Sequence, residues 1–223
     1  MSETRPQADL DVIAQLRQAI LRGSFQPNQR LIEAELASMF DTNRANVRVA
    51  LAVLEQEGLV DREVNRGARV RMVSEEEALE IVDVRLALEA RVAFLAASKA
   101  TPEDCQALQN LADRMRKAHG ANEYLVLSEL NDELHQKLQA IAANQTLSKI
   151  LKGLKSRLVR LQFRSILMPG RADRSVVEHI NLIDAIIAGD PDRADKAMRI
   201  HMEGVKEGLR LTIEMHRATL MHI

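Results

Sequence analysis

The sequence lacks several residue types that common protein classes require. It has one cysteine, Cys105, which excludes an internal disulfide and a cysteine-rich zinc module and suits a reducing compartment. Four Phe, one Tyr and no Trp are too few for the stacking platforms that bind single-stranded nucleic acids. No apolar run approaches the ~20 residues of a membrane span, and the first ten residues do not resemble a signal peptide. We therefore expect a cytoplasmic, helix-rich protein.

Charge is unevenly distributed along the 223 residues, although the net charge is only −1. Residues 1–73 contain ten arginines and ten acidic residues but no lysine and no histidine, whereas all six histidines lie in the C-terminal half. A content of 46% apolar and 28% charged residues is typical of a globular chain and not of a disordered one. We expect two domains, 1–73 and 74–223.

The first domain shows helical spacing of apolar residues over residues 10–22 and 33–40. A third helix is predicted from an N-cap at Asn43 to Gly58. Its inward side chains are expected to be Val47, Leu51 and Leu54. Those of the second helix are expected to be Ile32, Leu36, Met39 and Phe40. Residues 64–72 alternate around Asn65-Arg66-Gly67, which predicts a β-hairpin. This order of elements is that of a winged helix-turn-helix.

The third helix carries the side chains suited to reading duplex DNA. Arg44 and Arg48, four residues apart, project from its N-terminal face beside Asn46. Arginine suits the guanine edge, and asparagine suits the adenine edge. Four arginines of the hairpin are opposed only by Glu63, which predicts a locally basic wing: Arg62, Arg66, Arg69 and Arg71. The alternative for each arginine alone is a solvated position on the surface.

This segment resembles the DNA-binding domain of the GntR superfamily of bacterial regulators. The matching residues are Ile20 and Gly23 before Pro27, Leu31, Leu36-Ala37, Phe40, Arg44, Val47-Arg48, Ala50-Leu51, Leu54, Glu57-Gly58-Leu59-Val60, and Asn65 with Gly67. The resemblance implies a winged helix-turn-helix on double-stranded operator DNA. The residues expected to contact DNA are Asn43, Arg44, Asn46, Arg48, Arg66 and Gly67.

The second domain is predicted to be entirely helical. Its expected helices span 74–99, 101–118, 123–142, 145–167, 175–188 and 190–215, with Thr101 and Asp190 as N-caps. Short connections between six helices indicate an antiparallel all-helical bundle. The inward face of the third of these helices is expected to contain Tyr124, Leu127, Leu134, Leu138 and Ile141.

Polar side chains fall on the apolar faces of three of these helices. Asn131 and His135 share one face, and His179 and His201 are in phase with apolar neighbours on two other helices. A divalent metal shared by the four side chains would give each of them a partner, and nitrogen ligands favour zinc or nickel. The alternative for each histidine alone is a hydrogen-bonded core residue. His119, His216 and His222 lie near chain or helix ends and are expected to be bystanders.

Arg85 also falls on an apolar helix face. A buried arginine beside a metal would bind an anionic ligand through two nitrogens. The equal alternative is a structural ion pair with an acid such as Glu89. This half of the chain resembles the FCD effector domain of the FadR branch of the GntR superfamily. The matching residues are Arg85, Leu88-Glu89, Asn131, Leu134-His135, Leu138, Ala142-Ala143-Asn144, Glu178-His179, Ile183, Ile186, Gly189-Asp190, Ala194, Ala197 and His201.

The second resemblance implies a metal held by Asn131, His135, His179 and His201, and a small carboxylate effector bound beside it at Arg85. We therefore expect a homodimeric transcriptional regulator, most often a repressor, on a pseudo-palindromic operator. Two alternatives stay open: a regulator of this type without a metal, and a metalloenzyme bundle tethered to DNA. No nucleophile–base pair or phosphate-binding loop is present, so an enzyme is not expected.

Overall fold

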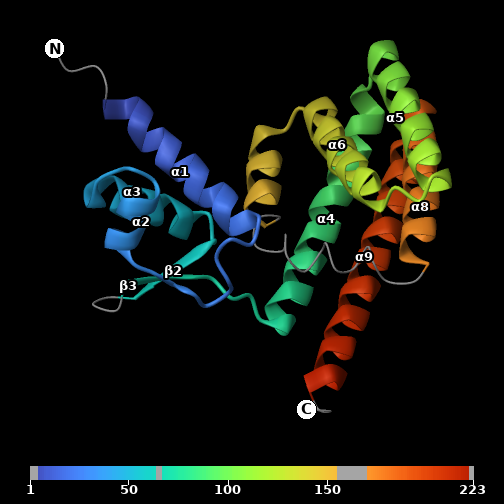
Figure 1. The fold of residues 1–223 in the computed structure, drawn as a ribbon. Coiled ribbons are helices and arrows are strands. Elements are labelled where there is room, and N and C mark those ends of the chain that lie inside the picture. The colour runs from blue at the N-terminus through green and yellow to red at the C-terminus, as the bar shows by residue number, and fades with distance from the viewer. Residues whose placement is uncertain (1–4, 64–66, 155–169, 221–223) are drawn as a thin grey trace. The chain divides into compact units, whose positions relative to one another are not determined.

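The computed structural model describes residues 5–63, 67–154 and 170–220 of the chain (Figure 1). The described residues fall into two compact units, one ending at Ser74 and the other beginning at Glu75. The first contains a small sheet, and the second is built from helices. Among the helices of the described ranges, none combines the length and the apolar character needed to cross a membrane.

The first unit surrounds one central helix. Its elements are α1 (Arg5–Leu21), β1 (Arg30–Leu31), α2 (Glu33–Met39), α3 (Arg44–Gln56), β2 (Val60–Glu63) and β3 (Gly67–Val70). Both α1 and α2 pack against α3. The three strands are antiparallel in the order β1-β3-β2, with Leu31 opposite Ala68 and Asp61 opposite Arg69. This is a winged helix-turn-helix, as predicted.

Helix α3 follows from its sequence at both ends and along one face. Asn43 is the N-cap, and its side chain accepts a hydrogen bond of 2.9 Å from the Asn46 backbone N–H. Gly58 adopts a φ of 72° just after the helix, a conformation that glycine reaches without strain. The predicted inward residues Val47, Leu51 and Leu54 are all buried. The predictions for this helix are therefore confirmed.

Two details of the first unit differ from the prediction. Strand β1 was not expected, because two residues are too few to show an alternating pattern. Ile32 and Met39 were expected on the inward face of α2, but they are 42% and 63% exposed. Ile32 is the N-cap and precedes the helix, so helical periodicity does not orient it. The buried face of this short helix is formed by Leu36 and Ala37.

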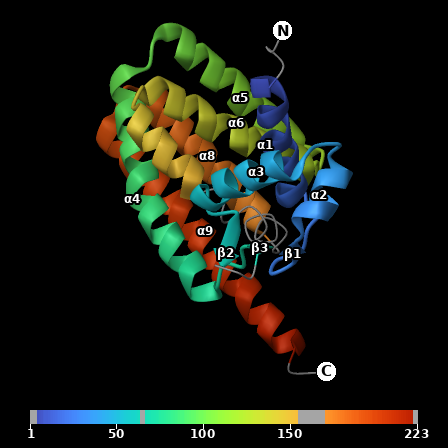
Figure 2. The same cartoon turned by 90° about the vertical axis from the view of Figure 1, so that its left-hand side faces the viewer.

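The second unit is a bundle of packed helices. Its elements are α4 (Glu75–Lys99), α5 (Pro102–Gly120), α6 (Tyr124–Ala142), α8 (Arg171–Ile187) and α9 (Pro191–Leu220), and residues 145–154 are also helical. The two longest, α4 and α9, lie side by side (Figures 1 and 2). α8 packs on both of them, and α5 and α6 pack on each other. The remainder of the helix predicted for residues 145–167 lies outside the described residues.

Capping residues place the helix starts of this unit where the sequence predicts them, with one exception. Thr101 and Asp104 form a capping box at α5, and Asp190 caps α9 by accepting from the Arg193 N–H at 3.0 Å. Helix α8, however, begins at Arg171, four residues before the predicted start. Tyr124, predicted to point inward, is 42% exposed because it is the first residue of α6.

Candidate functional site

The N-terminal end of α3 presents two of the predicted DNA-reading side chains to solvent. The side chains of Arg44 and Arg48 are 64% and 59% exposed. Asn46 lies between them and donates its side-chain N–H to Thr42 Oγ1 at 3.2 Å. Because Asn43 uses its side-chain oxygen as the helix cap, both asparagines have a structural contact in addition to any contact with DNA.

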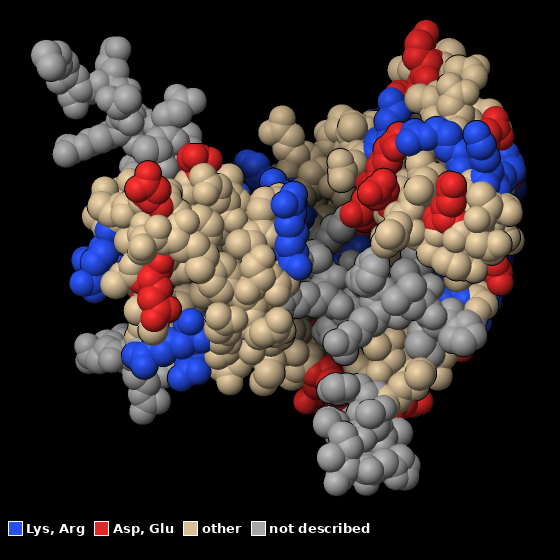
Figure 3. Space-filling view, viewed as in Figure 1, with Lys and Arg blue, Asp and Glu red and all other residues tan. Residues whose placement is uncertain are grey.

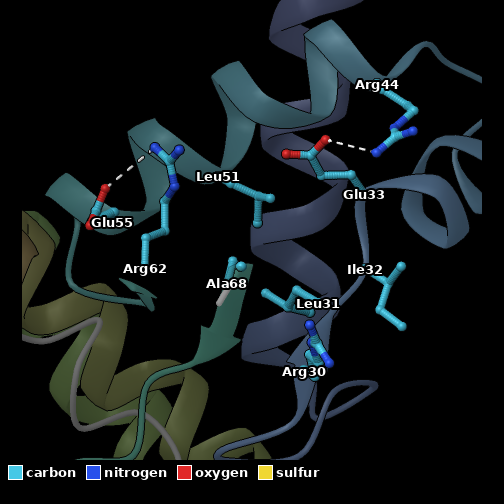
Figure 4. Close-up of a pocket in the computed structure, with 10 residues that line it drawn as sticks. Arg30, Leu31, Ile32, Glu33, Arg44, Leu51, Glu55, Arg62 and Ala68 are labelled. Carbon is cyan, nitrogen blue, oxygen red and sulfur yellow. Dashed lines mark ion pairs between the residues drawn. The ribbon is translucent and has the colours of Figure 1, made fainter. Parts of the chain in front are cut away.

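A carboxylate of α2 contacts both exposed arginines. Glu33 Oε2 lies 3.0 Å from Arg48 Nε. The same oxygen lies 3.6 Å from Arg44 Nη2 (Figure 4). Sequence reasoning did not identify Glu33, since its contacts cross from one helix to the next and leave no periodic signal within α2.

The prediction of a wing opposed only by Glu63 is wrong for the described arginines. Arg62 lies 3.6 Å from Glu55 of α3, and Arg71 lies 4.0 Å from Asp61 across the sheet. Arg69 donates to the Asn28 carbonyl oxygen at 3.2 Å. Arg66 lies outside the described residues. Gly67, which begins β3, is exposed with a φ of 86°.

A hollow of about 610 Å³ opens between α3, the sheet and the start of α2 (Figure 4). Its wall combines charged and apolar side chains with one glycine: Arg30, Glu33, Arg44, Glu55, Arg62, Leu31, Ile32, Leu51, Ala68 and Gly67. Three arginines and two glutamates therefore lie around the same surface, which makes it mixed in charge and not uniformly basic.

The C-terminal bundle brings three of the predicted histidines together. His135 on α6, His179 on α8 and His201 on α9 are all buried. One nitrogen from each ring lies within 4.8 Å of the others, and the Nε2 atoms of His179 and His201 are 3.3 Å apart. The fold therefore converges three imidazole rings that are separated by 44 and 22 positions in the sequence.

Two of these rings each have their Nδ1 atom within hydrogen-bond distance of a carboxylate. Glu89 Oε2 lies 3.1 Å from His135 Nδ1, and Glu178 Oε2 lies 3.0 Å from His201 Nδ1. An Nδ1–H donated to a carboxylate leaves Nε2 as the lone-pair nitrogen. This is the outer-shell arrangement that orients histidine ligands of metal ions.

Burial lowers the pKa of two of the three histidines. Desolvation, with smaller contributions from the neighbouring histidines and Arg171, lowers the pKa of His179 and of His201 well below the ordinary value. Burial alone would raise the pKa of the Glu89 carboxyl, but His135 and Arg85 outweigh it and bring that pKa to about 2. The lowered pKa values favour neutral rings for His179 and His201, the form in which a histidine binds a metal ion.

Arg85 is buried in the same bundle, and its guanidinium group is only partly satisfied. Its Nη2 donates to Glu89 Oε1 at 3.1 Å, so the predicted alternative of an ion pair with Glu89 is present. Its Nε and Nη1 have no hydrogen-bond partner among the described residues. These two nitrogens lie on different edges of the guanidinium group, so each has an N–H donor left for an additional acceptor.

The structure leaves the fourth predicted ligand less defined. Asn131, one turn before His135 on α6, is half-buried, and its side-chain nitrogen lies 3.5 Å from Asp132 Oδ1. His119 lies elsewhere, exposed and 2.7 Å from Asp173. The side chain of His216 and all of His222 lie outside the described parts of the chain.

Sequence reasoning assigned no role at the site to two residues near the cluster. Arg171 is 3% exposed and donates to Glu178 Oε2 at 2.9 Å, on the carboxylate that also contacts His201. Arg171 was missed because α8 was expected to begin four residues later. Glu178 precedes His179 in the sequence, but no spacing rule couples it to His201 on another helix.

The three histidines fit a divalent metal. Two ligand nitrogens at ~2.0–2.1 Å from a tetrahedral zinc lie about 3.3 Å apart. The Nε2 atoms of His179 and His201 already have this separation. Carboxylates hold the Nδ1 atoms of His135 and His201, and one nitrogen of each of the three rings lies within 4.8 Å of the others. Three protein nitrogens also leave coordination positions open for a further ligand.

Comparison with known proteins gives both halves of the chain a family. Residues 9–70 match the family described as bacterial regulatory proteins, gntR family, and residues 80–204 match the FCD domain. The HTH-type transcriptional repressor RspR of Escherichia coli K12 is 28% identical over 195 residues, which cover 87% of this chain and 86% of RspR. The HTH-type transcriptional repressor NanR of Cronobacter sakazakii is 29% identical over 221 residues, which cover 86% of this chain and 81% of NanR.

Solved structures agree on the fold. E. coli McbR/YncC superposes with a TM-score of 0.75 at 19% identity, covering 94% of this chain and 98% of its own. A putative transcriptional regulator GntR from Rhodococcus sp. RHA1 superposes with a TM-score of 0.69 at 22% identity, and the match covers 90% of this chain and 96% of that one. Because the FCD match spans more than half of the chain and the gntR match precedes it, the chain belongs to the GntR family of bacterial regulatory proteins, as a DNA-binding transcriptional regulator with an FCD domain and not an enzyme.

Proposed function

We propose that this protein is a cytoplasmic, homodimeric transcriptional repressor whose binding to a pseudo-palindromic operator is controlled by a small carboxylate held at a metal ion in the FCD domain. The observation that carries the proposal is the convergence of His135, His179 and His201 beside Arg85. The relatives RspR and NanR are described as repressors, which supports the direction of control.

The metal would be held by the three histidines, with Asn131 as the expected fourth ligand. Nitrogen donors favour zinc or nickel among divalent ions. Bound there, the metal would supply a positive charge and an open coordination position for an anionic oxygen. Glu89 and Glu178 would keep the rings of His135 and His201 oriented through their Nδ1 atoms.

Arg85 supports a carboxylate as the effector. A buried donor without a partner costs ~1–3 kcal/mol, and Arg85 has two such nitrogens among the described residues. Because Nε and Nη1 lie on different edges of the guanidinium group, each offers a separate charge-assisted hydrogen bond to an anionic oxygen. Binding would therefore relieve an unfavourable state of the free protein, and it would do so in the bundle that holds the histidines.

The effector would act on DNA binding through the balance between two arrangements of the protein. A ligand shifts such a balance only by its difference in affinity for the two states. The DNA contacts are proposed for Arg44 and Arg48, with Asn43, Asn46 and the wing residues Arg66 and Gly67 beside them. Two copies related by two-fold symmetry would read two half-sites of the operator.

The metal is tested by elemental analysis of protein purified without added metal. We expect close to one zinc or nickel ion per chain in the parent protein, and a severe loss of it in His135→Ala. His119→Ala is the matched control, because His119 is exposed and contacts Asp173 away from the cluster. Circular dichroism would establish that each variant is folded.

A metal-free parent that also fails to take up zinc or nickel when it is supplied would contradict the metal site. The 3.3 Å contact between His179 and His201 would then be a hydrogen bond between neutral rings. The regulator would in that case bind its effector without a metal, through Arg85.

A further inference from the structure

Glu33 occupies an unusual position on the surface proposed to read DNA. It is an acidic residue that faces the two arginines expected to approach an anionic duplex, and one oxygen, Oε2, contacts both Arg48 and Arg44. Figure 4 shows the Glu33 carboxylate next to the Arg44 guanidinium group, joined to it by an ion pair. The Glu33 side chain is 28% exposed, so it is more enclosed than either arginine.

Stability alone does not account for this contact. Ion pairs between partly exposed side chains contribute about 0–1 kcal/mol. A favourable effect of negative charge at the start of α2 is shared with Glu35, an exposed acid in the same first turn. Glu35 therefore provides the helix-terminus effect without a contact to either arginine, and the placement of Glu33 needs another reason.

The geometry of the pair orients Arg48. Glu33 accepts a hydrogen bond from Nε, which lies on the side of the guanidinium group. Among the described residues, the two terminal nitrogens donate no hydrogen bond. Reading a guanine requires two N–H donors aimed together at O6 and N7. Holding the Nε edge limits the rotamers of a long side chain before DNA arrives and keeps its terminal donors available.

The negative charge of Glu33 affects contacts to the phosphates of DNA. Affinity for DNA of any sequence comes mainly from positive side chains that replace counterions on phosphates. A carboxylate between Arg44 and Arg48 reduces the positive charge that both can offer to a phosphate. The first 73 residues already balance ten arginines with ten acids, so little diffuse attraction is available to replace it.

We propose that Glu33 is a positioning residue that determines how strongly the protein discriminates its operator from other DNA. It orients Arg48 for a base edge and weakens the attraction of Arg44 and Arg48 to phosphates of any sequence. This role rests on the proposed function of the two arginines as base-reading side chains. It adds a residue of the preceding helix to the determinants of specificity.

The test compares Glu33→Gln with Glu35→Gln, which removes the same charge from the same helix turn. The operator probe is a duplex that the parent protein selects from a randomised library, and the reference is the same duplex with its sequence scrambled. Dissociation constants for both duplexes are measured by fluorescence anisotropy over a series of salt concentrations. Thermal unfolding of each variant checks that the fold is retained.

We expect Glu33→Gln to bind the scrambled duplex at least five-fold more tightly and to lose about ten-fold in discrimination. Its affinity for scrambled DNA should also depend more steeply on salt concentration. One additional phosphate contact corresponds to a change of ~0.9 in the slope of log affinity against log salt concentration. Glu35→Gln should change the affinity for both duplexes by the same factor. Glu33→Asp keeps the charge but shortens the reach, so it should leave scrambled-DNA affinity near that of the parent and weaken only operator binding.

Three results would overturn the proposal. If Glu33→Gln weakened binding to the operator and to the scrambled duplex by the same factor, the role of Glu33 would be to hold α2 against α3. Identical behaviour of Glu33→Gln and Glu35→Gln would leave only a general charge effect. If Glu33→Gln reduced discrimination between the two duplexes just as much in a protein that already carries Arg48→Ala, Glu33 would not act through Arg48. Failure of the parent to enrich any duplex would instead overturn sequence-specific recognition, and this role with it.

Discussion

Gly204 occupies a point where α9 passes close to the side chains of α8. A Cβ at this position would lie 2.8 Å from Glu178 Oε1 and 3.3 Å from the guanidinium carbon of Arg171. The first distance is shorter than carbon–oxygen contacts allow, so one of these groups would have to move. Glu178 is the carboxylate that contacts His201 Nδ1. A side chain at residue 204 would therefore press on the carboxylate that belongs to the outer shell of the histidine cluster.

Gly204→Ala should weaken metal binding without removing a ligand. The added methyl group would displace the Glu178 carboxylate from His201, and loss of such an outer-shell partner typically lowers metal affinity 10–100-fold. The measurement is competition with a chromophoric zinc chelator. Gly120→Ala is the control, because no atom lies within 4 Å of a Cβ at that site. An unchanged zinc affinity of Gly204→Ala would show that the Glu178 contact does not support the site.

At the scale of the element, the start of α3 combines a structural role with a proposed role in DNA binding. Asn43 caps the helix through Oδ1, and Arg44 and Arg48 follow on its first two turns. The cap fixes the direction of the first turn and therefore the direction in which both arginines leave the helix. The remaining amide nitrogen of Asn43 is a hydrogen-bond donor at the exposed N-terminal end of this helix.

Two substitutions of Asn43 separate these roles. Asn43→Ala removes the cap and should lower the free energy of unfolding by ~1 kcal/mol, measured by urea denaturation. Asn43→Ser keeps a side-chain oxygen that caps nearly as well, so its stability should stay within about 0.3 kcal/mol of the parent. Because serine lacks the amide donor, Asn43→Ser should still bind the selected duplex several-fold less tightly. Full operator affinity in Asn43→Ser would restrict Asn43 to capping.

At the scale of the whole molecule, the two units differ in their chemistry. The N-terminal unit has arginines and acids in small separate patches on the face shown in Figure 3, in agreement with its balanced charge. The C-terminal unit contains the buried histidines, the buried pair Arg85–Glu89 and the partly buried pair Arg171–Glu178. Ligands of the bundle should therefore affect the stability of one unit directly.

Removal of the proposed metal should destabilise the C-terminal unit selectively. A ligand present at 100 times its dissociation constant stabilises the folded state by ~2.7 kcal/mol. Hydrogen-exchange mass spectrometry before and after treatment with a chelator should therefore show faster exchange in peptides from α6, α8 and α9. Peptides from α3 should exchange at unchanged rates, and added zinc or nickel should restore the protection. Equal acceleration in both units, or none in either, would contradict a metal within this bundle.

The sequence by itself determined the elements and the residue types of both sites. Periodicity, caps and glycines placed most helices because they act over three or four neighbouring residues. The N-cap at Asn43 and the capping box at Thr101 are examples. The same periodicity put His135, His179 and His201 on inward faces, and all three are buried. Family resemblance then added the order of the two domains and the expected function.

Only the tertiary structure decided which side chains meet across elements. Glu33 and Arg48 are 15 positions apart, His135 and Glu89 are 46 apart, and Arg62 pairs with Glu55 of another element. Such contacts depend on the packing of whole helices, so no local pattern in the chain records them. The sequence therefore determined which side chains each element offers. The packing determined that Glu33 meets Arg48, that Glu89 meets His135, and that two nitrogens of Arg85 have no partner among the described residues.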